Sequence, residues 1–238
     1  MNIEVLSNSG LVAEKAASII ADYARETIAA RGSYIMAVSG GHTPWIMLRS
    51  LADARIPWRA VHIFQVDERV APDGHTDRNL THLRESLAES PLPADQLYAM
   101  PVESPDLDTA AVRYAKTLRN IAGEPAVIDL VHLGLGPDGH TASLVPGDPV
   151  LDVGDEDVAL SGPYQNRCRM TLTYPIINRA RRILWVVTGG EKAGMVKRLL
   201  DGDRSIPAGR VRSDSAMLVA DSAAAAQLTN ETGEVLCA

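Results

Sequence analysis

The stretch "DLVHLGLGPDGHTASLVPG" (129–147) joins an apolar run directly to a loop rich in turn residues. Its first eight residues (129–136) are almost entirely apolar and end in glycines, which is typical of a strand buried on both faces of a parallel sheet. The glycines and Pro137 that follow indicate a sharp turn, with His140 held on it. The stretch therefore predicts a buried strand that leads into a loop carrying one histidine.

Similar apolar runs recur along the chain and alternate with segments of helical periodicity. The strongest runs are 34–40, 61–68 and 182–190, and weaker candidates are 3–7, 169–174 and 215–221. Helical patterns cover 10–32, 43–53, 106–123 and 191–202. This alternation predicts an α/β fold, with a doubly wound, mainly parallel Rossmann-like sheet and helices on both faces. No internal linker interrupts the pattern, so we expect one domain over residues 1–238.

The ends of the predicted helices carry recognisable signals. In the helix over 10–32, Val12, Ala16, Ile19 and Tyr23 share one face, and Gly32 marks the end. In the helix that follows the run at 34–40, we expect Thr43 to be the N-cap and Pro44 to lie in the first turn.

Composition narrows the class of protein. The chain has 238 residues and a formal net charge of -7, which opposes general binding to nucleic acid. No apolar stretch approaches ~18 residues, and the N-terminus lacks the pattern of a secretion signal, so we expect neither membrane insertion nor export. Two cysteines, Cys168 and Cys237, are too few for a disulfide framework, which favours a cytoplasmic protein. An anionic small molecule remains a compatible partner.

The chemically distinctive residues follow the predicted strands. They are Gly40 and Gly41, Asp67 to Arg69, Gly136 to His140, and Gly189 and Gly190. In open parallel sheets, ligands bind where the carboxyl ends of the strands meet. We therefore expect these four segments to converge on one small-molecule site.

The loop "SGGHTP" (39–44) lies between a strand and a helix. Gly40, Gly41 and Thr43 would offer backbone N–H groups and a hydroxyl at a helix N-terminus, where an anion is favoured. A tight turn that simply requires glycine explains the same residues equally well. The loop is neither a Walker A sequence nor a G-x-G-x-x-G fingerprint, so it does not indicate a nucleotide.

Asp67 and Arg69 come just where a strand should leave the sheet. A carboxylate there can accept hydrogen bonds from sugar hydroxyls, and a guanidinium can bind a phosphate or an oxyanion. A local ion pair that caps the strand is the alternative. His75 and His82 lie in a polar stretch, and we expect them to face solvent.

His140 is the candidate general base. We expect the glycine-rich loop to place it at a helix N-terminus, where the dipole keeps the imidazole neutral, and Asp138 to orient the ring. His132 lies inside the apolar strand, where we expect it to pack in the core with a hydrogen bond rather than to bind a metal with His140.

Further cations come from Arg167 and Arg169 and from Lys192, which follows a glycine pair. A lysine at the start of a helix opposes the helix dipole, and an anionic ligand there would remove the conflict. A solvated lysine is the alternative.

Taken together in order, "SGGHTP", "VDERVAP", "DLVHLGLGPDGHTASLVPG", "RMTLTYPIIN", "GGEKA" and "IPAGRV" resemble the 6-phosphogluconolactonase family, within the wider group that includes glucosamine-6-phosphate deaminases. The resemblance covers nearly the whole chain. It implies hydrolysis of 6-phosphoglucono-δ-lactone to 6-phosphogluconate in the oxidative pentose phosphate pathway, without metal or organic cofactor. It also implies that His140 is catalytic and that the phosphate binds near Gly40, Gly41 and Thr43, with Arg69, Arg169 and Lys192 as cations.

The sequence departs from the family pattern at a few positions. Arg78-Asn79 stands where Ser-Asn is frequent, and Val145 where a bulky aromatic residue is common. In the deaminases a glutamate follows the histidine closely, whereas this chain reads "ASLVP" (142–146) there, which favours the lactonase. The alternatives are a deaminase or isomerase of amino-sugar phosphates and a non-catalytic sugar-phosphate sensor. The sequence leaves monomer and homodimer open, and the oxyanion donor open between Arg69 and the backbone.

Overall fold

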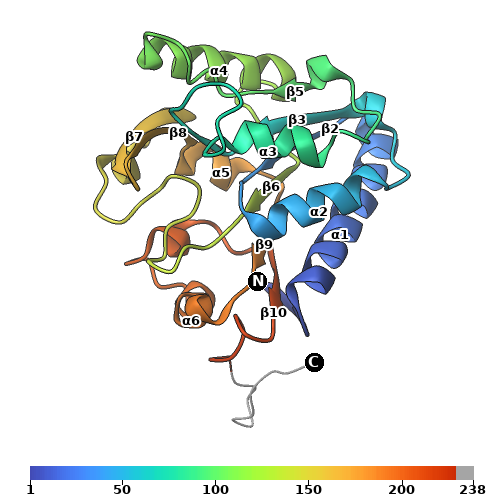
Figure 1. Ribbon diagram of the computed structural model, residues 1–238, viewed down its shortest axis with the longest axis vertical. Coiled ribbons are helices and arrows are strands. Elements are labelled where there is room, and N and C mark those ends of the chain that lie inside the picture. Colours follow the sequence, from blue (N-terminus) through green and yellow to red (C-terminus); the bar gives the residue numbers. More distant parts are fainter. Residues whose placement is uncertain (229–238) are drawn as a thin grey trace.

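The computed structural model describes residues 1–228, and its centre is a parallel sheet (Figure 1). The strands of this sheet are β1 (Asn2–Leu6), β2 (Tyr34–Val38), β3 (Val61–Gln65), β5 (Leu97–Tyr98), β6 (Leu130–Leu133), β9 (Arg182–Val187) and β10 (Ala216–Asp221). Their order is β1-β10-β9-β6-β2-β3-β5, and every neighbouring pair is parallel. The predicted doubly wound α/β sheet is confirmed.

Helices cover both faces of this sheet because its central strands are apolar on both sides. All five residues of β2 are buried. Tyr34, Met36 and Val38 pack with α1 (Ser9–Arg31), α2 (His42–Ala52) and α3 (Asn79–Ser86). Ile35 and Ala37 face the opposite core, which holds α4 (Leu107–Ala122), α5 (Tyr174–Arg179) and α6 (Ala193–Leu200). The sheet thus separates two hydrophobic cores.

A second, antiparallel sheet contains β4 (Asp67–Arg69), β7 (Val158–Tyr164) and β8 (Arg167–Leu172). The predicted strand 61–68 was wrong in extent, because it is divided between the two sheets at Val66. The Val66 N–H donates to Val38 O in the parallel sheet, and its carbonyl accepts from Leu172 N–H in the antiparallel one. The candidate strand 169–174 lies in the small sheet only as far as Leu172, because Tyr174 begins α5 (Tyr174–Arg179). Residues Val158, Met170 and Leu172 of the small sheet share a core with Ala37.

The helix ends follow the sequence signals in part. Gly32 ends α1 in the left-handed region, at φ 82°, and its N–H donates to Ile28 O. The prediction that Thr43 caps α2 was wrong, because Gly41 is the N-cap and the helix begins at His42. Gly41 has φ 131°, a conformation that glycine adopts without strain.

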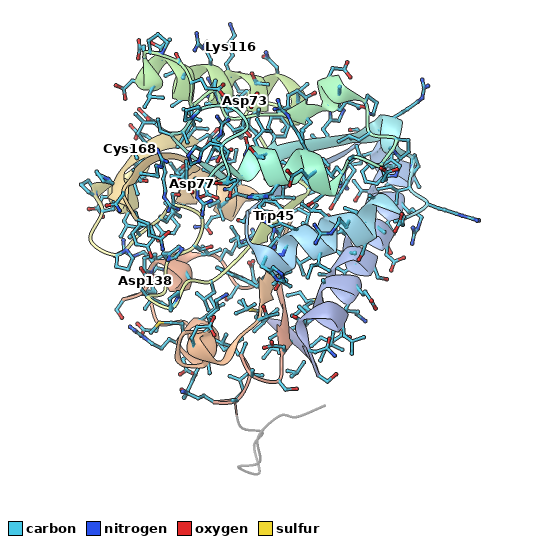
Figure 2. The ribbon with its side chains drawn as sticks, viewed as in Figure 1. Trp45, Asp73, Asp77, Lys116, Asp138 and Cys168 are labelled. Atoms are coloured by element: carbon cyan, nitrogen blue, oxygen red, sulfur yellow. The ribbon has the colours of Figure 1, made fainter. Side chains whose placement is uncertain are left out.

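Cys168 lies exposed on β8 as a free thiol (Figure 2), whereas Cys237 falls outside the described residues. Within residues 1–228, no helix is both long and apolar enough to cross a membrane.

Candidate active site

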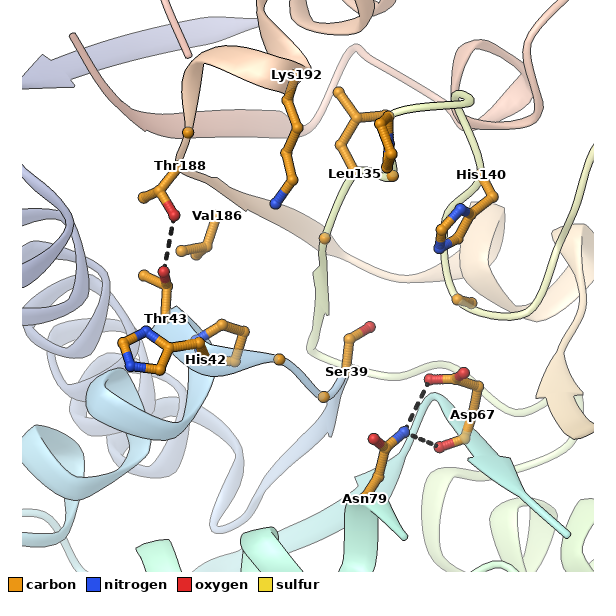
Figure 3. A pocket seen from close by; sticks show the side chains of 18 of the residues that line it. Ser39, His42, Thr43, Asp67, Asn79, Leu135, His140, Val186, Thr188 and Lys192 are labelled. Atoms are coloured by element: carbon orange, nitrogen blue, oxygen red, sulfur yellow. Dashed lines mark hydrogen bonds between the residues drawn. The ribbon is translucent and has the colours of Figure 1, made fainter. Parts of the chain in front are cut away.

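A pocket of about 550 Å³ opens at the carboxyl edge of the parallel sheet. The loops after β2, β6 and β9 contribute to its wall, together with β4 and β8 (Figure 3). The sequence-predicted residues that line it are Gly40, Gly41, Thr43, Asp67, Arg69, His140, Arg169 and Lys192. The predicted convergence of the loops is therefore confirmed. Asp138 stands outside the lining and contacts His140 from behind.

The loop after β6 is folded tightly around the histidine. The Gly136 N–H donates to His140 O at 2.9 Å, and the Gly139 N–H donates to Gly136 O at 3.0 Å. A Cβ on Gly136 would lie 2.0 Å from His140 Nδ1, so only glycine leaves room for the ring. Gly139 adopts φ 85°. The glycines thus shape the seat of the imidazole.

The prediction that His140 lies at a helix N-terminus was wrong. The chain instead forms a local turn, in which Leu144 N–H donates to Thr141 O at 2.9 Å, and Thr141 pairs with Leu144 as an isolated bridge. "TASLVP" (141–146) contains only two good helix formers, Ala142 and Leu144, and Pro146 and Gly147 leave no length for a helix. The environment of the ring is therefore set by Asp138 rather than by a helix dipole.

Asp138 holds the imidazole directly, as predicted. His140 Nδ1 lies 2.6 Å from Asp138 Oδ1, which also accepts from the His140 backbone N–H at 3.1 Å. Burial opposes ionisation of Asp138, but the hydrogen bonds from His140 and Tyr164 outweigh it and hold the pKa of this carboxyl below its ordinary value. A carboxylate at Nδ1 favours the tautomer protonated there, which leaves Nε2 as the free base.

Asp67 lies in the pocket wall, and its side chain is buried. Its Oδ2 accepts from Ser143 Oγ at 2.7 Å, while its backbone carbonyl accepts from Asn79 Nδ2 at 3.0 Å. Asn79 Oδ1 in turn accepts from Arg69 at 3.0 Å. Asp67, Asn79 and Arg69 thus form one polar wall, in which Arg69 is held at the edge of the pocket.

Glu68 anchors this wall from the core. Its fully buried carboxylate accepts from the backbone N–H groups of Arg69, Asn79 and Leu80, each at 2.8 Å. Arg78 Nε lies 3.1 Å from Glu68 Oε2 and is itself buried. Arg78, which stands where serine is frequent in the family, therefore neutralises the Glu68 carboxylate beneath the site and does not face the pocket.

Arg169 supplies a buried guanidinium. Only 4% of this residue is exposed, and burial lowers its pKa from the ordinary value, although Asp67 opposes that effect from 4.0 Å. Arg167, the first residue of β8 beside the hairpin turn, lies outside the pocket, and its guanidinium donates to Asp77 Oδ2, 2.8 Å away. Of the two arginines Arg167 and Arg169, the latter alone lines the pocket.

The start of α2 and Lys192 form the opposite wall. Thr43 Oγ1 lies 2.8 Å from Thr188 Oγ1, which ties α2 to the end of β9. Lys192 caps α6, and Figure 3 shows its side chain reaching into the pocket between the threonine pair and His140. Among residues 1–228, no carboxylate forms an ion pair with Lys192. This wall combines a helix N-terminus with a lysine ammonium, which suits an anion.

His132 packs in the core, as predicted. It is fully buried, and its Nδ1 accepts from the Ser39 N–H at 3.2 Å, while Ser39 Oγ donates to the His132 carbonyl. Burial lowers the pKa of His132 to about 3, so the ring is neutral near pH 7. Within the described chain, no group of three or more His, Cys, Asp or Glu side chains is arranged to hold a metal ion. His75 and His82 are partly exposed.

Sequence reasoning missed three side chains that complete the site: Ser143, Tyr164 and Thr188. Each contacts a predicted residue over a separation of 24 to 145 positions. Ser143 lies in the stretch 129–147 and Thr188 in the run 182–190. Both follow a predicted strand, so their position in the sequence could have indicated that they belong to the site. Tyr164 lies in "GPYQN" (162–166), which carries no recognisable pattern.

The fold and the pocket define a class of protein. It is an α/β protein with a small-molecule site at the sheet edge, in which a carboxylate-held imidazole faces an anion-binding wall. The chain belongs to the family described as glucosamine-6-phosphate isomerases/6-phosphogluconolactonase, whose model matches residues 7–220.

Relatives within this class refine the comparison. Over 195 residues the chain is 36% identical to a 6-phosphogluconolactonase of Synechocystis sp., which covers 80% of this chain and 81% of that relative. The solved 6-phosphogluconolactonase of Trypanosoma brucei matches with a TM-score of 0.84 at 26% identity, over 96% of this chain and 98% of its own. A solved monomeric glucosamine-6-phosphate deaminase also has a TM-score of 0.84, at 18% identity, over 96% of this chain and 100% of its own. The last likeness shows the fold alone, so the fold does not separate the two activities.

Proposed function

We propose that this protein hydrolyses 6-phosphoglucono-δ-lactone to 6-phosphogluconate in the oxidative pentose phosphate pathway. The observation that carries the proposal is the Asp138–His140 pair, 2.6 Å apart, facing a pocket whose other wall bears Lys192. Relatives named 6-phosphogluconolactonase support it. The segment after His140 also lacks the glutamate typical of the deaminases.

The phosphate binds at the α2 end of the pocket. The backbone N–H groups of Gly40 and of Gly41, the N-cap, lie just before α2, and the Thr43 N–H lies in its first turn, where it has no partner inside the helix. Lys192 and Arg169 supply positive charge at that pocket. A substrate held by its phosphate presents its lactone carbon to the imidazole, which replaces a random encounter by a fixed geometry.

The imidazole then acts as base and acid in turn. His140 Nε2 takes a proton from a water molecule as the water oxygen bonds to C1 of the lactone. The tetrahedral intermediate collapses, the bond from C1 to the ring oxygen breaks, and His140 returns the proton to that oxygen. The lactone is an activated ester, so one positioned base, worth roughly 10²–10⁴-fold, is sufficient chemistry.

Polar groups in the wall stabilise the developing charge. Arg69 and the N–H groups of the loop after β6 are the donors available for the oxyanion, and their contribution grows in the transition state. Asp67 is fixed by Ser143 and Asn79, and it accepts hydrogen bonds from the sugar hydroxyls.

If Lys192 binds the substrate phosphate, Lys192→Ala should weaken binding of the phosphorylated lactone. Loss of one charge-assisted contact raises KM for the phosphorylated lactone by about tenfold or more, with kcat nearly unchanged. The matched control is Lys197→Ala, which removes an exposed lysine of α6 that pairs with Asp201. Steady-state kinetics on the phosphorylated lactone and on unphosphorylated glucono-δ-lactone measure the difference.

An equal loss on both lactones would remove the phosphate role from Lys192. The reaction itself is tested separately with glucosamine 6-phosphate. We expect no ammonia release, and ammonia release without lactone hydrolysis would replace the proposed function by the deaminase. Binding of 6-phosphogluconate with no turnover of any substrate would identify a sensor.

A further inference from the structure

The hairpin of β7 and β8 carries Tyr164, whose side chain contacts both the Asp138–His140 pair and Arg169. Its tip, Gln165 and Asn166, has φ values of 52° and 62°, the left-handed pair that closes a tight two-residue turn. Tyr164 immediately precedes this tip and pairs with Arg167 across the hairpin. The turn therefore fixes where the Tyr164 ring projects.

On one side, Tyr164 contacts the carboxylate that holds the imidazole. Its hydroxyl donates to Asp138 Oδ2 at 3.1 Å, while Asp138 Oδ1 is occupied by His140. The same hydroxyl lies 3.4 Å from His140 Nδ1, and the two rings meet edge to face with centroids 5.1 Å apart. Both oxygens of Asp138 are thus engaged, and the carboxylate cannot rotate without losing a hydrogen bond.

On the other side, Tyr164 supports Arg169. The guanidinium carbon lies 5.0 Å from the centroid of the Tyr164 ring, within the range of a cation–π interaction. Arg169 also donates to the Tyr164 carbonyl at 3.3 Å and to Gln165 Oε1 at 3.2 Å. The ring and backbone of the hairpin tip therefore determine where this buried cation points.

We propose that Tyr164 is a positioning residue that couples the general base to the anion-binding arginine. Its hydroxyl locks Asp138 so that His140 keeps its proton on Nδ1, and its ring and carbonyl hold Arg169 toward the substrate. This inference rests on the proposed function in its kinetic part, because it assigns Tyr164 a role in lactone hydrolysis.

The protonation state of Tyr164 agrees with a donor role. Burial, and then the nearby Asp138 carboxylate, raise the pKa of the phenol above its ordinary value, so it remains protonated at neutral pH. The ionisable groups that face Tyr164 are Asp138 and His140 from the loop after β6, and Arg169 from β8. Removing the hydroxyl leaves the Asp138 charge less neutralised, which favours imidazolium at His140.

The decisive variant is Tyr164→Phe, which keeps the ring and removes only the hydroxyl. We expect kcat to fall about fivefold, which corresponds to one ordinary hydrogen bond of about 1 kcal/mol. We expect KM to stay within about twofold, and the acid limb of the kcat/KM profile to move to higher pH. Tyr164→Leu removes the ring as well, so KM for the phosphorylated lactone should also rise, by about fivefold.

Tyr98→Phe is the matched control, because the Tyr98 hydroxyl also contacts a histidine Nδ1, that of His62 at 3.0 Å, outside the pocket. We expect it to keep the kcat and pH profile of the wild type. Tyr164→Phe with unchanged kcat and an unmoved acid limb, in a wild type that hydrolyses the lactone, would overturn the proposal.

A second readout is independent of catalysis. Nitrogen-15 NMR of the His140 ring reports which nitrogen carries the proton, and we expect the ratio of the two tautomers to change in Tyr164→Phe, because Asp138 loses the hydrogen bond that fixes it against Nδ1. An unchanged tautomer ratio would refute the positioning role even if the wild type proved inactive on the lactone. Inactivity of the wild type together with a changed ratio would instead refute only the proposed function.

Discussion

At the scale of single residues, the site depends on the space and the partner given to one imidazole. Gly136 leaves the space, because any side chain there would overlap the His140 ring. Asp138 is the partner, two positions before His140, and the spacing of these two residues was enough to predict their contact. A short segment of sequence can therefore specify a base when the partners are neighbours in the chain.

Gly136→Ala tests this claim. The new methyl would lie 2.0 Å from His140 Nδ1, so the ring must move away from Asp138. A displacement of about 1 Å costs on the order of 100-fold in kcat, while KM changes little because the phosphate wall is untouched. Gly154→Ala is the control, since nothing lies within 4 Å of its added Cβ. Retention of wild-type kcat by Gly136→Ala would show that the observed ring position is not the catalytic one.

At the scale of elements, two of the pocket loops, those after β2 and β6, are joined beneath the sheet edge. Ser39 follows β2 and exchanges two hydrogen bonds with His132 of β6, so the glycine loop and the catalytic loop start from one fixed point. The apolar surroundings keep His132 neutral in the folded protein. This burial makes stability sensitive to acid.

We expect the folded protein to lose stability as the pH falls, because His132 is protonated more easily in the unfolded chain. Burial lowers the pKa of His132 to about 3 in the folded protein, whereas a histidine in the unfolded chain has its ordinary pKa of 6.5. As the pH falls below 6.5, the unfolded chain takes up the proton first, so stability is lost. Between pH 7 and pH 5 this residue should remove about 2 kcal/mol from the unfolding free energy.

His132→Asn keeps an acceptor for the Ser39 N–H but has no titrating ring. The unfolding free energy of this variant should therefore not show the decrease of about 2 kcal/mol between pH 7 and pH 5. Urea unfolding at pH 7 and pH 5 gives the comparison, which concerns the change with pH rather than absolute stability. His82→Asn, at a half-exposed position in α3, is the control and should retain the acid-dependent loss. An identical pH dependence in wild type and His132→Asn would contradict the assignment.

At the scale of the whole molecule, the sequence predicted the parallel sheet well and the antiparallel sheet poorly. Strands buried on both faces, such as 34–38 and 182–187, are continuous apolar runs and are easily recognised. The run 61–68 conceals a change of sheet at Val66, because no glycine or proline marks the passage from β3 to β4. Strand 158–164 contains Gly162 and Pro163, which are typical of a turn, and β5 has only two residues.

The site residues that could be predicted from sequence are those that directly follow the strands of the parallel sheet. Residues directly after apolar runs were found, because the carboxyl ends of parallel strands meet at one edge. Tyr164 was missed because its place depends on the second sheet, 26 positions away from Asp138. Arg167 was named as a cation beside Arg169 but lies outside the pocket, because its guanidinium pairs with Asp77, 90 positions away in the sequence.

The most direct test of the account compares wild type and His140→Asn in a coupled assay. Glucose-6-phosphate dehydrogenase generates the lactone in situ, at a mildly acidic pH where spontaneous opening is slow. We expect the wild type to exceed the spontaneous rate, and the variant to lose at least about 100-fold in kcat with KM nearly unchanged. A variant that keeps near-wild-type kcat would show that His140 is not the base, and a folded wild type that adds nothing to the spontaneous rate would contradict lactone hydrolysis itself.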